Sequence, residues 1–121
     1  MAWQFESGRP IYLQVAEIVR KRVISGEYPQ GSRLPAVRDL AVEAGVNPNT
    51  MQRALLTLEE SQIVHSQSTA GRFVTEDMEL LEQMKYQTAR KSVLDFIRHM
   101  EELGYSSEEL VQLITKVTQE A

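Results

Sequence analysis

The residues best suited to chemistry are side-chain amides, a hydroxyl and arginines, and they gather near the middle of the chain. The stretch "GVNPNTMQR" contains Asn47, Asn49, Thr50, Gln52 and Arg53. Amide side chains can pair with the major-groove edge of a base, adenine in particular, and arginine suits phosphate or guanine. These residue types indicate recognition of a polar partner by hydrogen bonds rather than catalysis.

The sequence contains no comparable set of residues for catalysis or for metal binding. The chain contains no cysteine, which excludes disulfides, thiolate metal sites and cysteine catalysis. His65 and His99 fall in different predicted elements, so we do not expect them to share a metal ion. No serine–histidine–aspartate set can be proposed with motif support, and no glycine-rich phosphate loop occurs in the sequence. We predict that the protein is not an enzyme and needs neither metal nor cofactor.

Two helices are predicted before the amide-rich stretch. Apolar residues at helical spacing follow Pro10 and stop before Gly26, which predicts a helix of about 15 residues with Pro10 in its first position. The segment "EYPQGSRLP" is typical of a turn. A short second helix is expected to begin at Pro35 and to end at Gly45.

The amide-rich stretch itself is predicted to open a third helix. Asn47 is a suitable N-cap, and Pro48 suits the first turn because its missing N–H would be unpaired there. The apolar stripe predicted to be buried is Met51, Leu55 and Leu58, and the residues predicted to face outward are Asn49, Gln52, Arg53 and Leu56.

Short helices joined by a tight glycine-containing connection are typical of a helix-turn-helix. Two strands, residues 63–66 and 72–75, are predicted to follow, with "QSTAG" as the loop of a hairpin. The predicted fold class is therefore mainly α with a small β-hairpin, a winged helix-turn-helix over residues 1–76.

Residues 77–121 are predicted to form two amphipathic helices, the second opened by a capping box from Ser106 to Glu109. Two such helices cannot bury both of their apolar stripes alone, which favours pairing with a second copy of the chain. The predicted dimerisation residues are Leu81, Met84, Phe96, Ile97, Met100, Leu110, Leu113, Ile114 and Val117.

Charge is divided unevenly between these two parts. The net charge is −4; residues 1–76 carry eight basic and eight acidic residues, and residues 77–121 carry five and nine. A neutral domain can still present a basic face, so the charge permits binding to nucleic acid without indicating it. No apolar stretch is long enough for a membrane span, and the N-terminus lacks the features of a signal peptide. We therefore expect a cytoplasmic protein with no membrane partner.

Residues 10–74 resemble the DNA-binding domain of GntR-family bacterial transcription regulators. The resemblance rests on Pro10 and Tyr12, then "SGEYPQGSRLPAVRDLA", "GVNPNT" and "AGRFV" in that order. The "NPNT" form and the short C-terminal part are similar to the YtrA-type subfamily. This resemblance implies a homodimeric regulator of operator DNA, often of transport operons, with two C-terminal helices in place of a large effector domain.

The resemblance also implies roles for single residues. Arg38 matches an arginine that contacts DNA, Thr50 a threonine that contacts phosphate, and Gly71 the wing tip that enters the minor groove. Arg53 and Arg72 are candidates for phosphate or groove contacts. Many relatives have an arginine where this chain has Pro48, so Asn49 must carry more of the base reading.

Other interpretations of these residues stay open at this stage. Asn47 and Asn49 can be caps and solvated polar residues only, and Arg38 can form a surface ion pair with Asp39 or Glu43. The winged helix can also be a protein-interaction module. The acidity of the chain and the predicted exposure of Leu56 are compatible with this alternative. The sequence identifies no operator, regulated gene, sign of regulation or effector.

Overall fold

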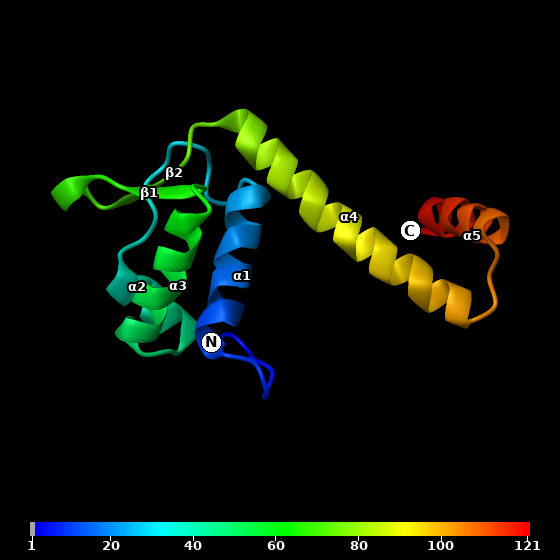
Figure 1. The fold of residues 1–121 in the computed structure, drawn as a ribbon, viewed down its shortest axis with the longest axis horizontal. Helices are drawn as coiled ribbons and strands as arrows, with labels where there is room; N and C mark the ends of the chain where they lie inside the picture. The colour runs from blue at the N-terminus through cyan, green and yellow to red at the C-terminus, as the bar shows by residue number, and fades with distance from the viewer. Residues whose placement is uncertain (1) are drawn as a thin grey trace. The chain divides into compact units, whose positions relative to one another are not determined.

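The computed structural model describes residues 2–121, and it is mainly helical with one small hairpin (Figure 1). In chain order its elements are α1 (Ile11–Ile24), α2 (Val37–Ala44), α3 (Pro48–Glu60), β1 (Val64–Ser66), a 3-10 turn η1 (Ser68–Ala70), β2 (Arg72–Val74), α4 (Met78–Glu102) and α5 (Ser107–Glu120). This order confirms the predicted fold class. Contacts divide the chain into an N-terminal unit, residues 1–85, and a C-terminal unit, residues 86–121.

The starts of the first two helices differ from the prediction. Pro10 is the N-cap of α1, because its ψ of 133° keeps it extended, and it is not the first helical residue. Pro35 lies two residues before α2, whose N-cap Ala36 is also extended with ψ of 151°. The preceding backbone is paired with the hairpin, since Leu34 N–H donates to the Arg72 carbonyl at 2.8 Å, and the chain turns helical only afterwards.

The turn between α2 and α3 forms as the sequence predicts. Gly45 ends α2 in the left-handed conformation, with φ of 74° and ψ of 33°. The Asn47 side chain caps α3 by accepting a hydrogen bond from the Asn49 N–H at 2.7 Å, and Pro48 occupies the first turn. These local signals fix where α3 begins and how its first turn is presented.

The hairpin has three-residue strands, each one residue shorter than predicted. β1 and β2 are antiparallel, with Val64 opposite Val74 and Ser66 opposite Arg72. A third segment, residues 32–34, lies along β2: Arg33 forms a bridge with Phe73, and Val74 N–H donates to the Ser32 carbonyl at 2.8 Å. The base of the hairpin is thereby joined to the chain that enters α2.

The core of the N-terminal unit lies between α1, α2, α3 and the hairpin. Its fully buried side chains include Val15 and Val19 of α1 and Leu40 of α2. From α3 it receives Met51, Leu55 and Leu58, and from the start of the hairpin Ile63, directly before β1, and Val64 of β1. The predicted stripe of α3 is thus confirmed, and the opposite face of that helix remains available to solvent.

The first two turns of α4 belong to this same core, which corrects part of the sequence interpretation. We expected Leu81 and Met84 in a dimer interface, and the domain boundary at residue 76. Leu81 is buried in the core cluster and Met84 packs against it, with the Arg20 guanidinium 3.8 Å from the Met84 sulfur. An apolar stripe demands an apolar neighbour, and for these two residues the neighbour lies within the same chain.

The C-terminal unit contains the rest of α4 and α5. The predicted capping box is formed: Glu109 N–H donates to Ser106 Oγ at 3.2 Å, and Ser106 N–H donates to Glu109 Oε1 at 3.0 Å. The backbone hydrogen bond from Ser106 lowers the pKa of the Glu109 carboxyl. Met100 and Leu110, which we expected in the dimer interface, are instead buried within the chain, whereas Phe96, Ile114 and Val117 are 42%, 41% and 50% exposed.

In the described part of the chain, no helix is both long enough and apolar enough to span a membrane.

Candidate nucleic-acid interface

The outer face of α3 carries the amide side chains predicted to read bases. Asn49, Gln52 and Arg53 are exposed and Thr50 is half-buried, while Met51 and Leu55 on the other face are buried. The helix therefore presents its polar N-terminal half as a surface, supported from behind by the core. Leu56 lies on the exposed side as well, at 45% exposure.

Arg53 is held in place by an aromatic ring from α1. Its guanidinium carbon lies 3.8 Å from the centre of the Tyr12 ring, a cation–π contact. The two side chains, with Pro10, Asn49 and Thr50 among their neighbours, line a shallow hollow of about 520 Å³. Arg53 thus remains beside the N-terminal end of α3 with its charge accessible to an anion.

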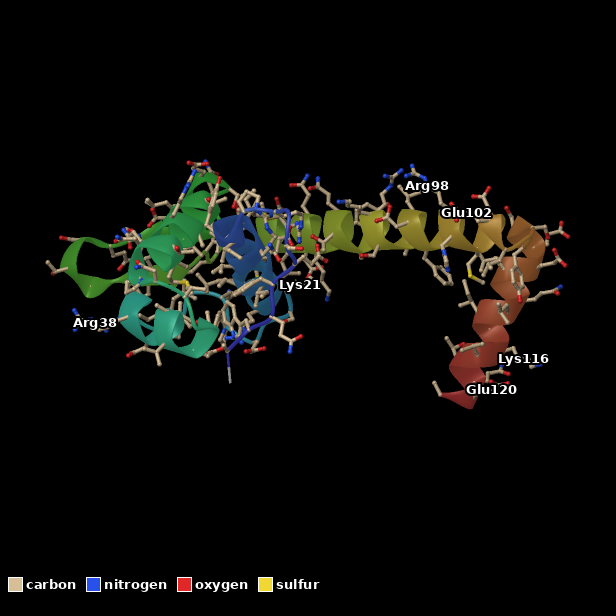
Figure 2. The ribbon with its side chains drawn as sticks, turned by 90° about the horizontal axis from the view of Figure 1, so that it is seen from below. Lys21, Arg38, Arg98, Glu102, Lys116 and Glu120 are labelled. Carbon is tan, nitrogen blue, oxygen red and sulfur yellow. The ribbon has the colours of Figure 1, made fainter. Side chains whose placement is uncertain are left out.

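Arg38 extends from α2 into solvent (Figure 2). It forms no ion pair with any of residues 2–121, so the sequence alternative of a pair with Asp39 or Glu43 is not what the structure contains. Glu43 is instead engaged elsewhere, 2.6 Å from the Arg22 guanidinium. Within the described residues, Arg38 is consequently a free cation on the helix that precedes α3.

Arg22 connects the N-terminal segment to the end of α2. Its guanidinium lies over the rings of Trp3 and Tyr28, at 4.8 Å and 5.7 Å, and pairs with Glu43. The Trp3 indole N–H also donates to Glu43 at 3.0 Å. The hydrogen bond from Arg22, more than that from Trp3, lowers the pKa of the Glu43 carboxyl, and the same pairing raises the pKa of Arg22.

The N-terminal segment also covers the turn that leads into α3. Trp3 N–H donates to the Ala44 carbonyl at 3.2 Å. The Ala2 side chain lies so close to Gly45 that a Cβ added there would be 2.6 Å from the Ala2 Cβ. Together with the Arg22 network, these contacts hold the turn whose geometry sets the approach of α3.

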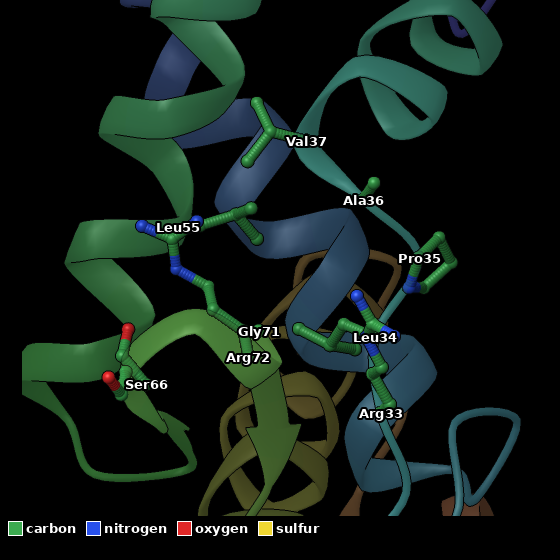
Figure 3. Close-up of a pocket in the computed structure, with 10 residues that line it drawn as sticks. Arg33, Leu34, Pro35, Ala36, Val37, Leu55, Ser66, Gly71 and Arg72 are labelled. Carbon is green, nitrogen blue, oxygen red and sulfur yellow. The ribbon is translucent and has the colours of Figure 1, made fainter.

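Arg72 of β2 is directed toward α3 rather than away from the molecule (Figure 3). Its Nε–H donates to Glu59 Oε1 at 3.0 Å, and its Nη1–H donates to Gln52 Oε1 at 3.2 Å. Ser66 Oγ–H donates to the same Glu59 oxygen. The sequence interpretation made Arg72 a phosphate or groove partner, but the structure engages its guanidinium within the chain and leaves the side chain only 15% exposed.

Arg33 is a candidate contact residue that the sequence interpretation did not single out. It is exposed and lies against Gly71, where an added Cβ would be 2.9 Å from Arg33 Nε. Gly71 has φ of 110° and ψ of −161°, a conformation open essentially only to glycine. Arg33 and Gly71 border a hollow of about 330 Å³ beside the wing (Figure 3). The available signal was the position of Arg33 within "GSRLP", directly before the predicted second helix.

Several known proteins that are similar to this chain are transcription regulators. Residues 11–74 match the family model described as "Bacterial regulatory proteins, gntR family". The HTH-type transcriptional regulator YhcF of Bacillus subtilis is 36% identical over 116 residues, 96% of either chain. The repressor YtrA of the same organism is 32% identical over 71 residues, 59% of this chain and 55% of YtrA.

Solved structures of GntR-family regulators have the same fold as this chain. A GntR-family transcriptional regulator from Listeria monocytogenes superimposes with a TM-score of 0.84 at 34% identity, covering 93% of this chain and 98% of that one. The DNA-binding domain of AraR in complex with its operator ORX1 superimposes with a TM-score of 0.56 at 23% identity, over 60% of this chain and 93% of that one. At that identity the AraR complex supports the fold alone.

Proposed function

Because the chain belongs to the GntR family of bacterial DNA-binding transcription regulators, we propose that it acts as a homodimeric repressor of the YtrA type that binds an inverted-repeat operator. The main support for this proposal is the polar, exposed N-terminal half of α3, which packs on the core through its other face. Two arginines lie near it: Arg38 is unpaired within the described residues, and Arg53 stacks on the Tyr12 ring.

We assign the DNA contacts to two groups of residues. Asn49 and Gln52 reach base edges in the major groove, since amide side chains carry sequence information there. Arg38, Thr50, Arg53 and Arg33 contact phosphates or sugar, which position the protein without reading sequence. Asn47 acts through its cap on α3, and Gly71 acts by shaping the wing.

The dimer interface is assigned to the C-terminal unit. Leu81 and Met84 are not part of this interface, because they lie in the core of the N-terminal unit. Of the other residues predicted for it, Phe96, Ile114 and Val117 are exposed, and Leu113 and Ile97 are half-buried. Apolar side chains at helical spacing on two adjacent helices fit the same hairpin from a second copy. Two recognition helices at a fixed separation then engage two half-sites of one operator.

A transport operon is the target that similarity to YtrA-type regulators implies, and the cytoplasm is where a regulator meets chromosomal DNA. Genes adjacent to the coding sequence, with any inverted repeat upstream of them, identify the operon.

The test is a titration of the full chain against a duplex selected from a pool with about 20 random base pairs, at two salt concentrations. Specific binding must weaken steeply with salt because phosphate contacts release counterions. Arg38→Ala should weaken binding and reduce the salt slope by roughly 1. Arg98→Ala, the same change of charge on exposed α4 of the C-terminal unit, is the matched control. Failure of the pool to yield any enriched sequence would refute the proposal.

A further inference from the structure

The side-chain oxygen of Gln52 is already engaged before any DNA arrives. Arg72 Nη1–H donates to Gln52 Oε1 at 3.2 Å, so the oxygen of this amide faces the wing. The amide nitrogen of Gln52 makes no hydrogen bond within residues 2–121. Gln52 is exposed, and it therefore offers an incoming base two N–H donors.

Arg72 is itself fixed from the other side. Glu59 Oε1 accepts from Arg72 Nε–H at 3.0 Å and from the Ser66 hydroxyl, so one carboxylate joins both strands of the hairpin to α3. The side chains of Arg72 and Glu59 are 15% and 22% exposed. A charge-assisted pair with so little exposure is stronger than a neutral contact, and it keeps the guanidinium against Gln52.

This arrangement changes which base suits Gln52. A free glutamine pairs with adenine by accepting from N6–H and donating to N7, and it needs its oxygen for the first of these bonds. Here the positive guanidinium beside that oxygen repels the N6–H of adenine and the N4–H of cytosine. Guanine instead presents two acceptors, N7 and O6, which suit the free N–H donors of the Gln52 amide while its oxygen stays turned toward Arg72.

We propose that Arg72 is a positioning residue for base selection: by holding the Gln52 oxygen, it makes Gln52 select guanine in the major groove in place of adenine. The inference rests on the proposed function, since it names the base that this regulator reads. It replaces the sequence expectation, under which any amide on this helix favours adenine. The Asn49 side chain has no such partner within the described residues, so Asn49 retains the preference for adenine.

The experiment compares base preferences selected from a pool of duplexes with about 20 random base pairs. The wild-type chain, Gln52→Met and Arg72→Met are each taken through the same selection. The pair read by Gln52 is the one at which Gln52→Met loses its preference. At that pair the wild type should select guanine, and Arg72→Met should shift the ratio of adenine to guanine by roughly fivefold or more. A purely structural role for Arg72 would weaken binding without changing the selected base.

Arg38→Met is the matched control, because Arg38 is also an arginine of the DNA-facing surface but has no contact with Gln52. It should lower affinity and leave the base unchanged. Gln52→Lys covers the case in which Arg72→Met fails to fold, since an exposed lysine offers donors only and should retain guanine.

The outcomes separate the inference from the proposed function. If the wild type selects adenine at the Gln52 pair, or if Arg72→Met leaves the base preference of the wild type unchanged, the inference is overturned and DNA binding still stands. Selection of adenine by Gln52→Lys, or no change with Gln52→Met, overturns it as well. Absence of any enriched sequence for the wild type overturns both.

Discussion

Gly45→Ala is the substitution whose cost can be worked out most fully, because two separate effects meet at this residue. Gly45 ends α2 in the left-handed conformation, and an alanine there carries a backbone penalty of about 1–2 kcal/mol. Its Cβ would also lie 2.6 Å from the Ala2 Cβ, closer than carbon atoms can approach. The N-terminal segment must then move away from the turn.

The second effect is limited by what the displaced segment would lose. Trp3 makes two hydrogen bonds at this site, from its backbone N–H to Ala44 and from its indole N–H to Glu43. At about 1 kcal/mol each, their loss adds at most about 2 kcal/mol. We expect Gly45→Ala to lower the free energy of unfolding by about 1–4 kcal/mol in total.

A double-mutant cycle separates the two effects. Ala2→Gly removes the opposing Cβ and should change stability by less than about 0.5 kcal/mol by itself, since Ala2 is exposed. When Ala2→Gly is already present, Gly45→Ala should cost only the backbone penalty of about 1–2 kcal/mol. Urea unfolding followed by circular dichroism measures all four proteins, at one protein concentration because a dimer's stability depends on it. An equal cost with and without Ala2→Gly would refute the packing of the N-terminal segment on the turn.

Three other substitutions test separate features. Asn47→Ala should lower the free energy of unfolding by about 1 kcal/mol through loss of the α3 cap, while Asn47→Asp retains it; equal losses in urea unfolding would contradict the cap. Because Arg22 lowers the pKa of the Glu43 carboxyl in the folded chain, the ionised carboxylate stabilises the fold at any pH above the pKa that Glu43 has in the unfolded chain. Wild type should therefore exceed Glu43→Gln in melting temperature near pH 7, and the gap should close as the pH falls through the lowered pKa; a gap independent of pH would rule this out. Phe96→Asp should dissociate the proposed dimer in sedimentation, whereas Val42→Asp, which also adds a negative charge at an exposed residue of α2, should not; a dimer that persists with Phe96→Asp would exclude Phe96 from the interface.

The presentation of α3 could be predicted from the sequence because its signals are local. The cap from Asn47 to Asn49 spans two residues, and the buried stripe of Met51, Leu55 and Leu58 follows helical spacing. Each of these features depends on neighbours within two turns of one helix. The start of α3 and its exposed face are therefore determined mainly by local sequence and depend little on tertiary packing.

The apolar residues of α4 show the opposite case. Helical spacing indicates that Leu81, Met84 and Phe96 need apolar neighbours, but it cannot say whether a neighbour lies in the same chain. The structure gives Leu81 and Met84 to the core of the N-terminal unit and leaves Phe96 exposed. One continuous pattern is thus divided between two uses.

The contact between Arg72 and Gln52 could not be predicted because it depends on register. The two residues are 20 positions apart, and they meet only because Ser66 pairs with Arg72 in the hairpin and Glu59 holds the arginine. A shift of one residue in that ladder would turn the arginine to the other face of the sheet. Sequence patterns identified the side chains able to form hydrogen bonds with a partner, but not which of them already bond to each other within the chain.

The contacts of Trp3 also make the protein its own spectroscopic reporter. Trp3 is the single tryptophan of the chain, half-buried, with its indole against the Arg22 guanidinium and bonded to Glu43. Indole emission responds to the polarity and the charges around the ring. All tryptophan fluorescence from the unlabelled protein therefore originates beside the turn that leads into α3, and any rearrangement of that turn during a DNA titration can be followed without attaching a dye.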